Sequence, residues 1–180
     1  MARPVSSDPL SILVAYDLWA TRRILVLCSG LSREQFHQRF EIGPGSLHDT
    51  LVHVILCISR WCERLAGRTP GPWALEKATE RTVADLGGML ESAHERLGTE
   101  IGRAFSLGLS STITMTYAGK AFTFTRGAVI THVLNHGTHH RAQCLNMLRR
   151  LAVTGLSDAL PDIDVVDWQS ETECLAGMTP

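Results

Sequence analysis

Residues 131–143 read THVLNHGTHHRAQ and hold four of the eight histidines of this 180-residue chain: His132, His136, His139 and His140. The segment lies in a longer run, residues 126–151, whose apolar side chains recur at helical spacing and predict a long helix. His132, His136 and His140 are each four residues apart, so they share one face of that helix, about 6 Å from one another along its axis. Two imidazoles at this spacing can ligate one metal ion.

The chain before this helix predicts three more long helices. Asp8 can cap the first, Pro9 fits its first turn, and apolar residues then recur as far as a stop at Gly30. A second helix is expected from Ser46 to Gly67 and a third from Thr82 to Phe105. Four long helices favour an all-α fold, a four-helix bundle, and such bundles often hold metals between facing helices.

Shorter elements are expected between and after these helices. Ser32 and Gln35 have capping-box spacing and predict a short helix. Residues 111–125 alternate threonine with apolar residues around AGK, which predicts a short β-hairpin before the last long helix. Residues 1–180 are interpreted as a single domain with a core of about 8–152. The tail, 153–180, should be partly ordered and pack across the domain, with Trp168 either anchoring it or covering a pocket.

Composition excludes several classes of function. Seventeen basic and eighteen acidic residues nearly cancel, so the chain has no bulk attraction to nucleic acid. It has no recognisable signal peptide and no apolar run long enough to span a membrane. Five cysteines without a CxxC pair indicate reduced thiols in a cytoplasmic protein: Cys28, Cys57, Cys62, Cys144 and Cys174.

A pair of histidines rarely completes a protein metal site, so a third ligand is needed from elsewhere in the chain. His53 is the better candidate, because an imidazole in the apolar stretch TLVHVIL must find a partner for its ring nitrogens. His48 lies in the first helical turn, where solvent should be nearer. Cys57 and Cys144 could supply thiolates, but core packing is the favoured interpretation for both.

The roles of Asp17, Arg141 and His132 remain open at this point. Asp17 falls within the apolar stripe of the first helix, where it could orient a ligand imidazole, contact substrate, or form an interhelical salt bridge with Arg141. Arg141 could bind a carboxylate of the substrate or of a thiol cofactor, although an ion pair at the surface or at a dimer interface is favoured. His132 is a candidate for a position beside the metal, and it and His139 keep a structural role as the default.

Several segments together resemble the DinB/YfiT-like family of metal-dependent enzymes. They are GSLHDTLVHVILCISRWCERLAG (45–67), THVLNHGTHHRAQCLNMLRRL (131–151), LVAYDLWATRRIL (13–25) and LPDIDVVDW (160–168). The resemblance implies a four-helix bundle with a divalent metal held by His53, His136 and His140. Two positions depart from the family pattern, because Ile58 replaces a frequent acidic residue and Ala142 replaces a usual glycine.

The expected chemistry follows from such a site. Three neutral ligands leave a coordination position open, where a divalent ion lowers the pKa of water or of a thiol. The resemblance therefore implies a hydrolase or a thiol-dependent S-transferase or isomerase that acts on a small molecule. The metal is expected to be Zn, Ni or Fe, and a low-molecular-weight thiol is a candidate cofactor. The resemblance also implies a homodimer. The alternatives are a metal that serves as a structural staple or as a sensor for a stress-related partner, and a chain in which the histidines bind no metal.

Overall fold

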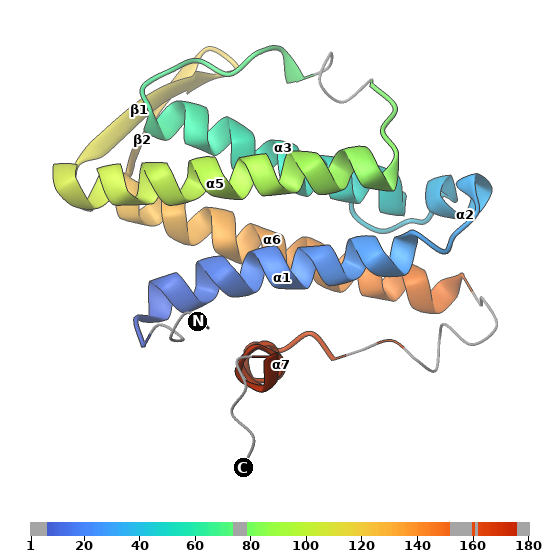
Figure 1. The fold of residues 1–180 in the computed structure, drawn as a ribbon. Coiled ribbons are helices and arrows are strands. Elements are labelled where there is room, and N and C mark those ends of the chain that lie inside the picture. The colour runs from blue at the N-terminus through green and yellow to red at the C-terminus, as the bar shows by residue number, and fades with distance from the viewer. Residues whose placement is uncertain (1–6, 74–78, 152–159, 161, 176–180) are drawn as a thin grey trace.

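The computed structural model describes residues 7–73, 79–151, 160 and 162–175. Four long helices dominate it: α1 (Pro9–Cys28), α3 (Leu47–Leu65), α5 (Val83–Leu107) and α6 (Arg126–Arg150). Helix α1 packs against α5 and α6, and α3 packs against the same two helices (Figure 1). The predicted four-helix bundle is therefore confirmed.

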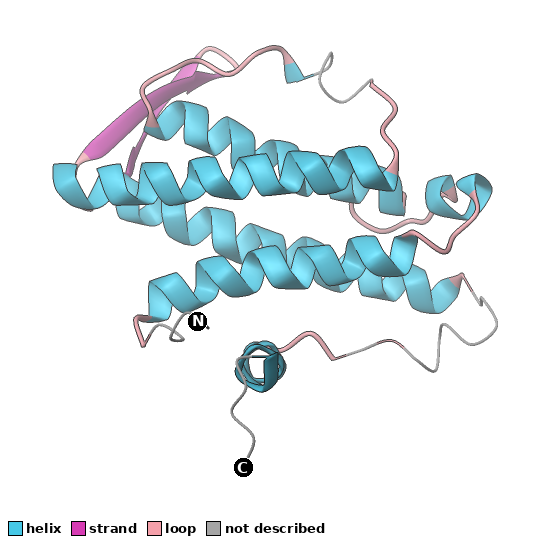
Figure 2. Ribbon diagram, in the orientation of Figure 1, coloured by secondary structure: helices cyan, strands magenta, loops and turns pink. Residues whose placement is uncertain are grey.

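Two short helices and two strands accompany the bundle (Figure 2). Helix α2 (Arg33–His37) connects α1 to α3. Strands β1 (Thr112–Tyr117) and β2 (Lys120–Thr125) form the predicted antiparallel hairpin, and β2 leads directly into α6. Helix α7 (Val165–Leu175) lies in the tail, which the sequence predicted only as partly ordered.

The capping residues fix where the helices begin. Asp8 accepts a hydrogen bond from the Ser11 amide at 2.8 Å at the start of α1, and Ser32 makes the predicted capping box with Gln35. Ser46 caps α3 and Thr82 caps α5, as their sequence positions predict. Helix α5 continues two residues beyond the expected end at Phe105.

The bundle is held together by an apolar core to which each long helix contributes. Its largest fully buried side chains include Ile24 from α1, Leu51 from α3, Leu90 from α5 and Met147 from α6. Burial of each such side chain stabilises the fold by roughly 1.5–3 kcal/mol relative to exposure. No described helix is long and apolar enough to cross a membrane.

Trp168 anchors the tail on the bundle. Its side chain is buried against Tyr16 and Ala20 of α1. The Tyr16 hydroxyl donates a hydrogen bond of 2.6 Å to the Ile163 carbonyl oxygen just before α7. Of the two roles left open for Trp168, the structure thus shows the anchoring one.

A buried carboxylate connects three of the four long helices. Asp17 of α1 is only 1% exposed, and its Oδ1 accepts a hydrogen bond from Nη1 of Arg141 on α6. The Nε2 atom of His94 on α5 lies 3.1 Å from Oδ2 of the same carboxylate. Asp17 therefore forms the interhelical salt bridge that the sequence left as one of its alternatives, and Arg141 lies in the interior rather than at the surface.

This carboxylate is ionised in spite of its burial. Burial disfavours its charged form, but hydrogen bonding with His94 and the charge and hydrogen bond of Arg141 outweigh this effect and hold the pKa of Asp17 below its usual value. Arg141 also donates from Nη1 to the Thr21 hydroxyl at 3.2 Å and from Nη2 to the Thr138 hydroxyl at 3.0 Å. The buried charge of Asp17 is thus paired with that of Arg141, as burial requires.

Helix α6 approaches Asp17 closely because residue 137 is glycine. A Cβ atom added to Gly137 would lie 2.3 Å from Asp17 Oδ1 and 2.8 Å from Arg141 Nη1. Both neighbouring side chains are almost completely buried and held by their partners, so they have little room to move. The glycine in HGTHHR is therefore explained by the ion pair beside it.

We expect Gly137→Ala to lower the free energy of unfolding by about 1–3 kcal/mol, because the added methyl overpacks the buried ion pair. Gly102→Ala on α5 is the matched control, since a Cβ there meets no atom within 4 Å. The control should raise the free energy of unfolding by roughly 0.5–1 kcal/mol through helix propensity. Urea denaturation of both variants measures the difference, and a stabilising Gly137→Ala would contradict the packing argument.

Candidate metal centre

Three histidine side chains from two helices meet between α3 and α6. His53 lies in the middle of α3, and His136 and His140 are one turn apart on α6. The Nε2 atom of His136 is 3.0 Å from that of His53 and 3.1 Å from that of His140. One ring nitrogen from each residue lies within 4.8 Å of the other two. The residues predicted as metal ligands are thus brought together.

The donor set and its spacing fit a divalent metal ion. Zinc binds imidazole nitrogens at about 2.0–2.1 Å, which puts two tetrahedral ligands about 3.3 Å apart. The observed separations of 3.0 and 3.1 Å between Nε2 atoms are close to that value. Three nitrogen donors without a carboxylate or thiolate also match the preference of Zn, Ni and Fe for imidazole.

Burial keeps the imidazole of His136 neutral at neutral pH. Burial, followed by the charges of His140 and His53, lowers the pKa of His136 to about 3. Burial also lowers the pKa of His140, against an opposing hydrogen bond from Gln143. Metal ligation requires the unprotonated ring, so protons compete little for His136.

Gln143 orients His140 within this cluster. Its Oε1 atom lies 2.7 Å from Nδ1 of His140. Because an amide oxygen can only accept, Nδ1 carries the proton and the lone pair of Nε2 faces the other histidines. Gly43, in the loop before α3, packs directly on this amide, since an added Cβ would lie 2.1 Å from Oε1 of Gln143. From the sequence Gln143 was only a weak candidate for binding substrate, and its role in orienting His140 was missed, although its position three residues after His140 was a usable signal.

The other histidines of the motif lie beside the cluster. His132 is exposed, and its ring centroid is 5.5 Å from that of His136 and 5.4 Å from that of Trp61. His139 is also exposed, and its Nε2 lies 3.0 Å from Nε2 of Gln143. Neither belongs to the group of donors that could share one ion among the described residues.

His48, the weaker candidate for the third ligand, lies elsewhere. It is buried, with 5% of its surface exposed, although the sequence suggested a position near solvent. Its Nδ1 lies 3.0 Å from Oδ1 of Asp49, and its ring stacks on His37 at a centroid distance of 4.4 Å. The helix cap at Ser46 and the packing of α2 cover this first turn, which the sequence alone did not reveal.

Cys144 belongs to the hydrophobic core, whereas Cys57 is half-buried beside it. Burial raises the pKa of Cys57 to about 11 and that of Cys144 to about 12, so both remain protonated at neutral pH. Neither is grouped with the three histidines. Ile58 is buried in the hydrophobic core.

Asp17 and Arg141 lie apart from the metal candidates, in the cluster that joins α1, α5 and α6. Arg141 directly follows His140 in sequence, but its guanidinium bonds to Asp17, Thr21 and Thr138. His94 completes that cluster and was missed by sequence reasoning, because nothing in its local sequence distinguishes it from other histidines on a helix.

Comparison with known proteins agrees with this architecture. A sequence model of the DinB family matches residues 6–167. The chain is also similar to Protein DinB of Bacillus subtilis (strain 168), with 27% identity over 173 residues that cover 93% of this chain and 98% of the relative. The family match spans all four long helices, the hairpin and the start of α7, and the chain therefore belongs to the DinB family.

Proposed function

We propose that His53, His136 and His140 hold one divalent metal ion and that the protein is a metal-dependent enzyme acting on a small molecule. The observation that carries the proposal is the convergence of three Nε2 atoms from α3 and α6. Catalytic sites characteristically have three protein ligands and an open position, whereas structural zinc sites are closed by four.

A divalent ion bound here would lower the pKa of water or of a thiol, which supports hydrolysis or a thiol-dependent S-transfer or isomerisation. The chain itself supplies the orientation of the ligands. Gln143 fixes the tautomer of His140, and the ring of Trp73 packs edge-on against His53 at a centroid distance of 5.5 Å. Held in this way, the histidines present their lone pairs to one point without reorganisation.

Two arginines lie over tryptophan rings on this side of α3: Trp73 packs against the ligand His53, and Trp61 packs against His132. The guanidinium of Arg60 lies 5.2 Å from the ring centroid of Trp73, and that of Arg64 lies 4.8 Å from Trp61. Their positive charge favours a substrate or thiol cofactor that carries a carboxylate. A small anionic molecule is therefore the substrate class that we propose.

The same proposal places the protein in the cytoplasm, as a homodimer. Cys28, Cys57, Cys62 and Cys144 are free thiols, which fits a reducing compartment. The homodimer rests on the family resemblance alone.

The ligand assignment is tested by removing one histidine at a time. His53→Ala and His136→Ala should each lose stoichiometric metal, since two remaining imidazoles hold an ion weakly. His139→Ala, from the same motif but outside the cluster, should keep about one equivalent. Elemental analysis of untagged protein after loading with zinc, nickel or iron measures this, and equal metal content in all three variants would refute the site.

The orienting role of Gln143 makes a separate prediction. Gln143→Leu removes the acceptor for His140 Nδ1 and should weaken metal binding about 10–100-fold. Gln143→Glu keeps an acceptor at that position and should retain the affinity. Competition with a chromogenic chelator gives both constants, and unchanged affinity in Gln143→Leu would show that the amide only packs against Gly43.

Catalysis is tested apart from metal binding. The cobalt-substituted protein should develop a thiolate charge-transfer band when a small carboxylated thiol is added, and His136→Ala should not. Metal-dependent turnover is then sought with ester, amide and thiol-acceptor substrates. Bound cobalt with neither a thiol band nor turnover would favour the structural staple or sensor over the enzyme.

A further inference from the structure

Gln143 contacts two histidines at once, and the two contacts use different ends of its amide. Its Oε1 atom lies 2.7 Å from Nδ1 of His140, and its Nε2 atom lies 3.0 Å from Nε2 of His139. An amide oxygen can only accept a hydrogen bond, and an amide nitrogen can only donate one. Two hydrogen bonds therefore run in the same direction, from His140 to Gln143 and from Gln143 to His139.

The orientation of this amide decides which nitrogen of His140 is free for a metal. With the oxygen toward Nδ1, the proton stays on Nδ1 and the lone pair stays on Nε2, the atom that lies 3.1 Å from Nε2 of His136. An amide turned by half a rotation would present its nitrogen to Nδ1, which would then have to accept, so the proton would belong to Nε2. A protonated Nε2 cannot bind a metal ion. The tautomer of His140 thus depends on the amide.

The packing around the amide does not choose between these two orientations. A Cβ atom added to Gly43 would lie 2.1 Å from Oε1 and 3.0 Å from Nε2 of Gln143, so the loop before α3 limits where the amide can lie. The oxygen and the NH₂ group are similar in size, however, and only their hydrogen bonding differs. Within the described part of the chain, His139 is the residue that accepts from Nε2.

His139 is well placed to hold the amide. It lies four residues before Gln143 on α6, a spacing that makes two side chains neighbours on one helical face. Its ring packs edge-on against that of His140, with centroids 5.0 Å apart and an interplanar angle of 78°. Its side chain is exposed, so it can be replaced without disturbing the hydrophobic core.

We propose that His139 is a positioning residue of the metal centre. By accepting a hydrogen bond from Nε2 of Gln143, it fixes the orientation of the amide, and through the amide it keeps the Nε2 lone pair of His140 available to the metal. The inference rests on the proposed site at His53, His136 and His140. It gives a role to a histidine that lies outside the group of metal ligands.

Long-range proton–nitrogen correlation spectra of the metal-free protein measure the tautomer of His140 directly. The unchanged protein should show one tautomer, with the proton on Nδ1, whereas His139→Leu should show both. His139→Glu restores an acceptor and should return the single tautomer. The single Nδ1-protonated form in His139→Leu, or any other tautomer population in the unchanged protein, would overturn the proposal.

Zinc affinity measures the consequence for the metal. His139→Leu should bind zinc about 3–10-fold more weakly, the effect expected from one hydrogen bond of ordinary strength. In the Gln143→Glu background both side-chain oxygens accept, so nothing is left to orient, and His139→Leu should change the affinity by less than about twofold. Equal losses in the two backgrounds would show that His139 acts only by packing on His140 and would overturn the proposal.

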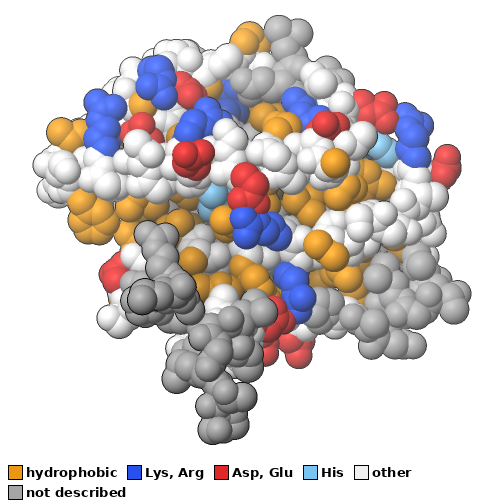
Figure 3. Space-filling view, in the orientation of Figure 1, with side chains coloured by type: hydrophobic (Ala, Val, Ile, Leu, Met, Phe, Trp, Pro, Cys, Tyr) orange, Lys and Arg blue, Asp and Glu red, His pale blue; other side chains and the backbone are white. Residues whose placement is uncertain are grey.

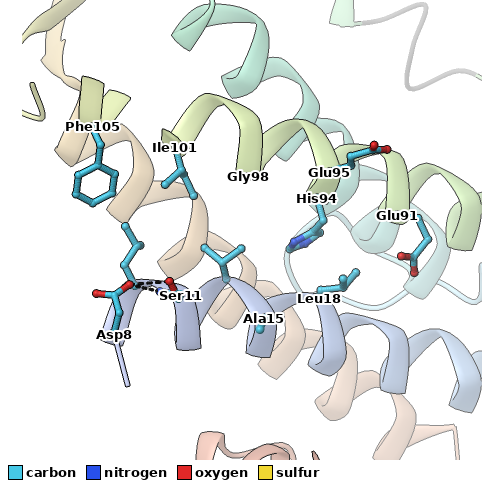
Figure 4. Close-up of a pocket in the computed structure, with 12 residues that line it drawn as sticks. Asp8, Ser11, Ala15, Leu18, Glu91, His94, Glu95, Gly98, Ile101 and Phe105 are labelled. Atoms are coloured by element: carbon cyan, nitrogen blue, oxygen red, sulfur yellow. Dashed lines mark hydrogen bonds between the residues drawn. The ribbon is translucent and has the colours of Figure 1, made fainter. Parts of the chain in front are cut away.

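A cavity between the other two long helices provides the control. It lies between α1 and α5, has a volume of about 510 Å³, and follows a furrow along which hydrophobic side chains gather (Figure 3). Glu95 is an exposed residue that lines it (Figure 4), and none of the lining residues belongs to the three-histidine cluster. Glu95→Leu should therefore change neither the tautomer of His140 nor the zinc affinity, and a loss equal to that of His139→Leu would overturn the specific role of His139.

Failure of the metal centre and failure of this inference give different results. No zinc binding by the unchanged protein would refute the three-histidine site, and the spectra of the metal-free protein would still decide whether His139 orients Gln143. Bound zinc with an unchanged affinity in His139→Leu would refute only the role of His139.

Discussion

The buried charge of Asp17 is the constraint on which the arrangement of the helices depends. A carboxylate that is 1% exposed is tolerated only if each oxygen has a partner, and those partners come from two other helices. Arg141 of α6 takes one oxygen and His94 of α5 contacts the other. The position of α1 relative to α5 and α6 is therefore set by polar geometry as well as by apolar packing.

The same constraint explains the composition of the histidine motif. Within HGTHHR, Gly137 and Arg141 are four residues apart and face Asp17. His136 and His140 have the same spacing but are offset by one residue, so they face His53 on α3. One short segment of α6 thus serves two surfaces, and the helical offset of about 100° per residue keeps the paired charges apart from the metal candidates.

Much of the fold and of the candidate metal centre could be predicted from the sequence, because the relevant signals are local. Capping residues and apolar periodicity placed α1, α3, α5 and α6, and the spacing of His136 and His140 identified a shared face. Choosing His53 over His48 depended on its apolar neighbours. The sequence left the partner of Asp17 open, because a salt bridge across 124 residues has no local signature. His94 escaped for the same reason, since Asp17 reaches it only in the folded chain, whereas the position of Gln143 three residues after His140 was a local signal that was not used.

Asp17 acts differently on His94 and on the metal candidate His140. One carboxylate oxygen is bonded to Arg141, which directly follows the metal candidate His140, and the other contacts His94, which lines the cavity between α1 and α5. The carboxylate contacts His94 directly, whereas it reaches His140 only through the backbone of α6. The metal centre therefore depends on Asp17 for the position of its helix and on Gln143 for the orientation of its ligand.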